Sequence, residues 1–136
     1  MRQVLDSFAG FDNFLVYLAV SLALLAAFIA IYVRVTPQRE FELIRAGNIA
    51  ASFSLSGAIL GFVIPLGAAV RSSVNLADMA IWGVIALGVQ IAAFIVVRII
   101  APSVCEDIEK GNAAQGFFLG SVSLAVGILN GSCMSY

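Results

Sequence analysis

Four long stretches without a charged residue dominate this sequence. They cover residues 14–33, 46–70, 79–97 and 111–136, and none contains Asp, Glu, Lys or Arg. Each reaches the roughly 20 residues that a helix needs to cross about 30 Å of hydrocarbon. A segment in lipid must satisfy its own backbone hydrogen bonds, and these runs lack the alternation of barrel strands. The sequence therefore predicts an all-α integral membrane protein whose four transmembrane helices contact the lipid bilayer.

The composition argues against several classes of function for this chain. Hydrophobic residues make up 62% and charged residues 11%, where a soluble domain has about 25% charged residues. The net charge of −1 provides no basic field, so we expect no nucleic-acid partner. There is no histidine, and Cys105 and Cys133 match no metal or redox spacing. We therefore expect no enzymatic activity, no catalytic residue, no metal and no cofactor.

The positive charges predict how the chain is oriented. Five of them flank the first and third connections between the stretches, and only Arg2 and Arg71 lie on the other side. Loops rich in Lys and Arg stay in the cytoplasm. We expect both of these connections to be cytoplasmic and both termini to be outside.

An internal repeat is the most specific feature of the sequence. Residues 28–67 and 92–131 share 13 identities in 40 positions at an offset of 64, where about four are expected by chance. The strongest part is Glu-x-Ile-x-x-Gly-Asn-x-Ala, which begins at Glu42 and again at Glu106. We predict two two-span repeats, 1–72 and 73–136, that form one membrane domain. Because each has two spans, the two-helix repeats are parallel, which suggests pseudo-rotational symmetry about the membrane normal.

This doubled signature, the repeat length and the four-span layout resemble the YjfL-like bacterial inner-membrane proteins, the DUF350 family. The resemblance covers nearly the whole chain, and the Gly-Asn pairs are its most specific part. It implies a multi-pass protein of the bacterial cytoplasmic (inner) membrane with an uncharacterised role. The two copies are not fully equivalent, because Pro65 corresponds to Leu129.

The second and fourth stretches hold nine of the twelve glycines. Small residues let helix backbones approach closely in lipid. We therefore expect these two helices to pack inward and the other two to face lipid more. The candidate packing residues are Gly57, Gly61, Gly116, Gly120 and Gly127.

A polar face accompanies these glycines. Its candidate residues, which either line a pathway or pack, are Asn48, Ser52, Ser56, Asn112, Gln115 and Ser123. Each Asn follows a Gly where its helix enters the membrane, so it can cap the helix or bond across helices. Alternatively, the carboxamides form a ring that coordinates an ion or solute.

Two hypotheses about function follow. The first is a structural or accessory membrane subunit that forms a homo-oligomer through its small-residue helices and recruits another membrane or cytoplasmic protein. The second is a small passive ion or solute channel lined by the polar residues of the second and fourth helices.

Overall fold

The computed structural model describes residues 1–134, and these residues form helices without strands. Three short helices accompany four long ones. The elements are α1 (Arg2–Phe8), α2 (Phe11–Val35), α3 (Glu40–Arg45), α4 (Ile49–Ser72), α5 (Leu76–Ile100), α6 (Val104–Glu109) and α7 (Ala113–Cys133). Residues 135–136, the end of the fourth charge-free stretch and of the second predicted repeat, lie outside the described residues.

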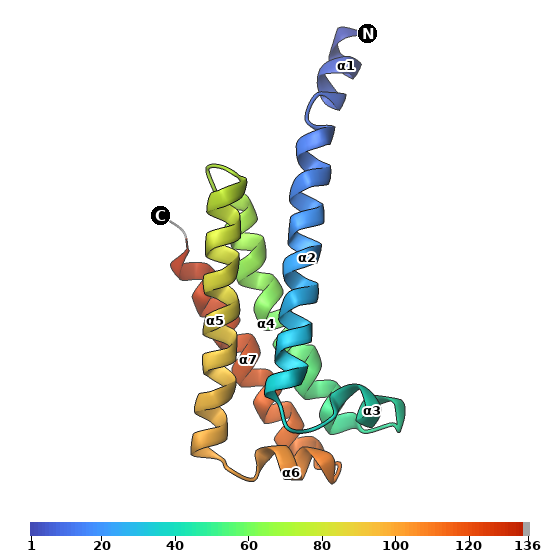
Figure 1. Cartoon of the computed structure of the whole chain (residues 1–136), viewed down its shortest axis with the longest axis vertical. Coiled ribbons are helices and arrows are strands. Elements are labelled where there is room, and N and C mark those ends of the chain that lie inside the picture. Colours follow the sequence, from blue (N-terminus) through green and yellow to red (C-terminus); the bar gives the residue numbers. More distant parts are fainter. Residues whose placement is uncertain (135–136) are drawn as a thin grey trace.

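The prediction of four membrane-spanning helices is confirmed. The α1–α2 segment, α4, α5 and α7 are each long and apolar enough to cross a bilayer. α4 begins at Ile49 rather than at residue 46, because a glycine corner separates it from α3. α1 and the first turns of α2 extend beyond the other helices (Figure 1).

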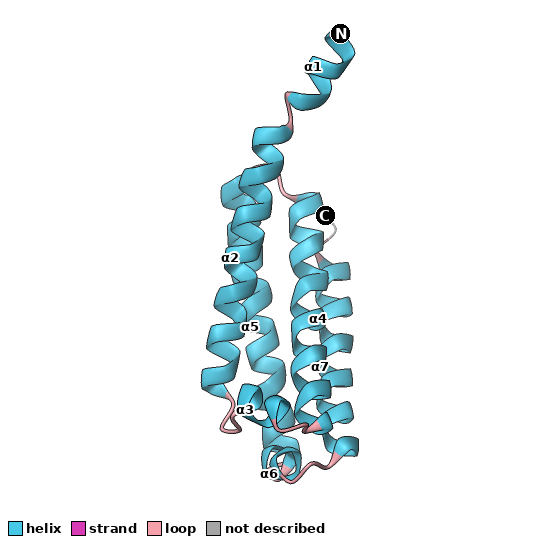
Figure 2. Cartoon of the chain, turned by 90° about the vertical axis from the view of Figure 1, so that its right-hand side faces the viewer, coloured by secondary structure: helices cyan, strands magenta, loops and turns pink. Residues whose placement is uncertain are grey.

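The four long helices form two layers, with α2 beside α5 and α4 beside α7 (Figure 2). α2 and α5 run toward the end that carries α3 and α6, here called the loop end, and α4 and α7 return from it (Figure 1). The two halves therefore enter from the same end, as expected for parallel repeats. A duplication of the chain stays a prediction.

A rotational symmetry of the whole bundle does not relate α2 to α5. A twofold axis between α4 and α7 would put α2 and α5 on opposite sides of that pair, but they lie on the same side (Figure 2).

Gly83 of α5 contributes to the placement of α2 beside α5. A Cβ atom at Gly83 would lie 2.8 Å from the Cδ1 atom of Leu24, so the glycine lets α2 approach α5 closely.

The closest packing joins α4 to α7. A Cβ atom on Gly57 would collide with the backbone of Gly120, and one on Gly127 would collide with the backbone of Gly61. Gly116 meets the backbone of Ala50 in the same way. All five candidate packing glycines thus lie in the α4–α7 interface, where their small size lets the two backbones touch.

Aromatic rings fill the space between α2 and its neighbours. Phe28 stacks on Phe62 of α4 with ring centroids 4.5 Å apart, and Tyr32 meets Phe94 of α5 edge to face at 5.6 Å. All four side chains are buried. The Tyr32 ring lies inside the protein, near the loop end of α2.

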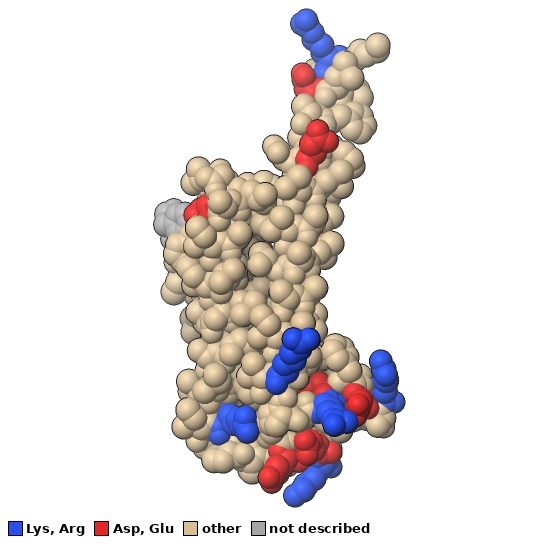
Figure 3. Space-filling view, viewed as in Figure 1, with Lys and Arg blue, Asp and Glu red and all other residues tan. Residues whose placement is uncertain are grey.

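Charged side chains gather at the loop end, over α3, α6 and the last turns of α2 and α5 (Figure 3). The middle of the visible face carries none (Figure 3). This distribution matches a bilayer around the middle of the bundle. Which end faces the cytoplasm stays a prediction.

Candidate functional site

The first Gly-Asn pair forms the corner between α3 and α4. Gly47 has a φ of +85°, a left-handed conformation that glycine adopts without steric cost. Its N–H donates to the Ile44 carbonyl at 3.0 Å, and the Asn48 N–H donates to the Leu43 carbonyl at 2.9 Å. These two bonds make a Schellman motif, which satisfies the last carbonyls of α3 and turns the chain sharply.

The second pair repeats this corner between α6 and α7. Gly111 has a φ of +83°, and its N–H donates to the Ile108 carbonyl at 3.0 Å. The Asn112 N–H donates to the Asp107 carbonyl at 2.9 Å. The signature thus corresponds to a short helix, a left-handed glycine and the residue that caps the following long helix.

Both asparagine side chains cap the long helices that follow them. The Asn48 side-chain oxygen accepts from the Ala51 N–H at 3.0 Å. The Asn112 oxygen accepts from the Gln115 N–H at 3.4 Å. Each bond satisfies one of the backbone donors that the start of a helix leaves free.

Asn48 also links the two halves of the chain. Its side-chain Nδ2 donates to the Ile108 carbonyl at 2.7 Å, across 60 positions of sequence. The same carbonyl accepts the corner bond from Gly111. Among the described residues, the Asn112 amide makes no corresponding bond to α3. The two Gly-Asn corners therefore share a local geometry and differ in their tertiary contacts.

The predicted polar face does not gather around one opening within the chain. Ser123 is buried against α4, where its carbonyl faces Gly61. Asn112 and Ser56 are exposed, and Ser52 and Gln115 are half-buried. Asn48 is engaged in its cap and its bond to α6. A pathway between α4 and α7 inside one chain would meet touching backbones.

A shallow groove of about 200 Å³ lies on the exposed side of the α4–α7 pair. Its eight lining residues are four pairs, and each pair is separated by 64 positions. They are Phe53 and Phe117, Ser56 and Gly120, Gly57 and Ser121, and Leu60 and Leu124. Phe53 and Phe117 meet edge to face at 5.7 Å. We call these eight residues the paired face, since corresponding residues of the two halves meet there.

A second polar feature, which the sequence reasoning missed, lies where α2 ends and α3 begins. Thr36, Gln38 and Glu40 expose 4%, 0% and 1% of their surface, whereas Pro37 and Arg39 are exposed. Alternate burial is typical of an extended segment with one face against the protein. We call residues 36–40 the strap.

Glu40 is the most unusual residue of the strap. One carboxylate oxygen accepts from the Gln38 side-chain amide at 3.1 Å, and the other, Oε2, is buried without a hydrogen-bond partner. The Gln38 Oε1 and the Tyr32 hydroxyl are likewise buried without partners. Burial raises the pKa of Glu40 to about 8, and the Gln38 bond opposes that shift. Glu40 is therefore largely protonated at neutral pH.

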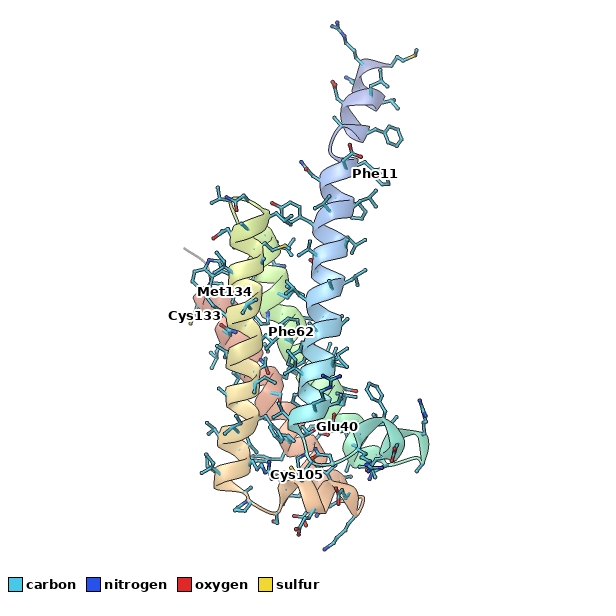
Figure 4. All side chains as sticks on the ribbon, viewed as in Figure 1. Phe11, Glu40, Phe62, Cys105, Cys133 and Met134 are labelled. Atoms are coloured by element: carbon cyan, nitrogen blue, oxygen red, sulfur yellow. The ribbon has the colours of Figure 1, made fainter. Side chains whose placement is uncertain are left out.

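Cys105 of α6 lies near the strap. Figure 4 shows Glu40 and Cys105 at the loop end of the bundle. Burial raises the pKa of the Cys105 thiol, Arg98 lowers it, and Glu40 and Glu109 raise it further when they are ionised. Cys105 is a buried free thiol, and Cys133 is exposed. Within residues 1–134, no three His, Cys, Asp or Glu side chains are grouped so that they could hold a metal ion.

Comparison with known proteins identifies the family. The model of the domain of unknown function DUF350 matches residues 5–134. The inner membrane protein YjfL of Escherichia coli K12, described as a UPF0719 protein, is 40% identical over 134 residues, which cover 98% of this chain and 99% of YjfL. The chain belongs to the DUF350 family. The transmembrane protein YshE of Bacillus subtilis is 27% identical over 113 residues, 80% of this chain and 84% of YshE. No solved structure matches the chain.

Membership of the DUF350 family indicates where this protein lies in the cell, and it does not indicate its activity. The YjfL relative is named as an inner membrane protein and YshE as a transmembrane protein, and this chain has four helices that can span a bilayer. This DUF350 protein is therefore a multi-pass protein of the bacterial inner membrane. The names of its relatives state no substrate and no reaction.

Proposed function

We propose that this protein is a non-enzymatic structural subunit of a membrane assembly, and that it associates with a second copy through the paired face. The observation that carries the proposal is the composition of this face. It joins four corresponding residue pairs from the two halves, and no described residue of α2 or α5 lines it.

The chemistry of the paired face suits helix packing in lipid. Small residues at its centre leave the groove, and exposed Phe53, Leu60 and Phe117 form its walls. The hydroxyls of Ser56 and Ser121 reach a region without water, where a bond to a neighbouring helix is favourable. A partner with the same face can insert its rings into this groove, and that arrangement has twofold symmetry.

Cysteine crosslinking in native membranes tests this proposal. Ser56→Cys and Ser121→Cys, each in a Cys133→Ser background, are expected to form disulfide-linked dimers on mild oxidation. The matched control is Leu22→Cys on α2, which is 56% exposed but lies outside the paired face, and it is expected to stay monomeric. Monomers in all three variants, or equal crosslinking of the control, would contradict the proposal. A crosslinked product heavier than the monomer but different from a dimer would indicate another membrane protein as the partner.

A passive channel is the alternative proposal, with Asn48, Ser52, Ser56, Asn112, Gln115 and Ser123 as its lining. Because α4 and α7 touch at their glycines, such a channel requires several copies of the chain. Ser56 and Asn112, the exposed members of this lining, would then contribute polar groups from adjacent copies. Ion and solute flux into liposomes that contain the purified protein distinguishes the two proposals, since a structural subunit is expected to conduct nothing.

A further inference from the structure

Polar groups with incomplete hydrogen bonds are buried in the strap and in the last turn of α2. Three oxygen atoms, on Tyr32, Gln38 and Glu40, are buried and lack partners. Burying a polar group without a partner is costly, and burying an ionised carboxylate without a counter-charge costs more. The only ion pair among the described residues joins Arg39 to Glu42, at 3.6 Å and on the exposed side. No cationic side chain of residues 1–134 therefore pairs with Glu40.

At the position that corresponds to Glu40, the second half of the chain has an apolar residue. The position 64 residues after Glu40 is Val104, which is also completely buried. The residues 64 positions after Gln38 and Tyr32 are Pro102 and Val96, which are apolar but exposed, so the correspondence in burial holds for Glu40 and Val104 alone. The second half thus buries an apolar side chain at the position where the first half buries a carboxyl. This difference indicates a role for the carboxyl beyond filling space.

We propose that Glu40, with Gln38 and Tyr32, forms a proton-binding site that holds the strap closed at the loop end. With its proton, the Glu40 carboxyl is neutral, so it fits the buried position and can donate a hydrogen bond to one of the unpartnered oxygens. When the proton leaves, the resulting anion has no counter-charge in this position. The strap then moves outward to hydrate the carboxylate and uncovers α6.

The surrounding titratable groups are consistent with this direction. Two of them act electrostatically with Glu40, namely Tyr32 of α2 and Cys105 of α6. Neither carries a positive charge, so neither provides a counter-charge for a Glu40 carboxylate. Arg98 of α5 and Glu109 of α6 act on Cys105, and no charged group acts strongly on Glu40 itself. The proton is therefore the species that balances the Glu40 charge.

Infrared titration of the wild-type protein in lipid vesicles tests proton binding directly. We expect the carbonyl band of a protonated carboxyl to persist at neutral pH and to disappear with a midpoint of about 8. The band is expected to be absent from Glu40→Gln and to remain in Glu42→Gln, whose carboxylate is exposed. Absence of the band from wild type at neutral pH would overturn the proposal. So would a midpoint that moves when sodium ions replace choline, because a metal cation would then occupy the site.

Labelling of Cys105 tests the opening of the strap. Cys105 is 5% exposed and is the only cysteine left in a Cys133→Ser background. Above about pH 8, we expect a maleimide to label it about tenfold faster than in Glu40→Gln, where no proton can be lost. Glu40→Val introduces the residue type that stands at the corresponding position 104. In this variant the strap is expected to stay closed in the same way. Equal labelling in the three proteins would overturn the opening step. The infrared titration on wild type remains decisive if either variant fails to fold.

Discussion

Gln90 of α5 donates a 2.8 Å hydrogen bond from its side-chain Nε2 to the backbone carbonyl of Gly61 in α4. In a regular helix, this carbonyl would accept a hydrogen bond from the backbone N–H of the residue four positions later. That residue is Pro65, which has no N–H. A side chain from the neighbouring helix thus supplies the donor that the proline removes, as membrane helices require of a freed backbone group.

This relationship predicts a coupling between Gln90 and Pro65. Gln90→Leu leaves the Gly61 carbonyl buried without a donor, so we expect it to lower the free energy of unfolding by about 1–3 kcal/mol. In a Pro65→Ala background the backbone N–H of the introduced alanine can serve that carbonyl, and the same substitution is expected to cost at least about 1 kcal/mol less. A double-mutant cycle from unfolding in detergent micelles measures the difference. Additive effects would show that Gln90 contributes through packing alone.

The α4–α7 interface predicts a strong dependence on glycine position. Gly57→Ala puts a methyl group into the backbone of Gly120, so we expect a loss of more than about 2 kcal/mol in the free energy of unfolding. Gly88→Ala in α5 is the control, since nothing lies within 4 Å of its added methyl group. It is expected to be neutral or to stabilise the helix by about 0.5–1 kcal/mol. Equal effects of the two substitutions would contradict the close approach of α4 and α7.

The sequence predicts the spans and the packing pair well, because both follow from local composition. Charge-free runs must enter lipid, and glycine-rich helices approach closely wherever they meet. The Gly-Asn corners are also local, since a left-handed glycine and a capping side chain need only neighbouring residues. The candidate packing glycines accordingly lie together in the structure.

Burial of Glu40 could not be predicted in this way. The residue stands between Arg39 and Phe41 in a charged connection, and such a position normally faces water. Its burial depends on contacts of the strap with distant helices, which the local sequence does not record. One sequence feature did indicate burial at this position, namely the apolar residue Val104 at the corresponding position of the second half. The neighbouring placement of α2 and α5 is equally a tertiary property.

The two capping asparagines are expected to differ in their contribution to stability. Asn112→Ala removes a cap alone, which costs about 1 kcal/mol. Asn48→Ala removes a cap and the 2.7 Å bond to the Ile108 carbonyl, so we expect about 1 kcal/mol more. Asn48→Asp separates the contribution of the cap from that of the bond to Ile108, because aspartate keeps the capping oxygen and lacks the side-chain N–H donor. Thermal unfolding in detergent ranks the three variants, and equal losses for the two alanine variants would exclude the link between the halves as a stabilising contact.

The raised pKa of Glu40 predicts that the fold loses stability as the pH rises. The pKa is about 8 in the folded protein, against an ordinary value of 4.5. Between these values the folded protein keeps the proton and the unfolded chain has lost it. The free energy of unfolding therefore falls with increasing pH across this window, by up to about 1.4 kcal/mol per pH unit, and levels off above about 8.

Glu40→Gln, which cannot ionise, is expected to remove most of this slope and to be more stable than wild type at alkaline pH. Glu42→Gln changes an exposed carboxylate, so the slope is expected to remain. Unfolding followed by Trp82 fluorescence at a series of pH values measures all three proteins. Stability that rises with pH in this window would mean that Glu40 is ionised in the folded protein, since a carboxylate stabilised by folding has the opposite dependence.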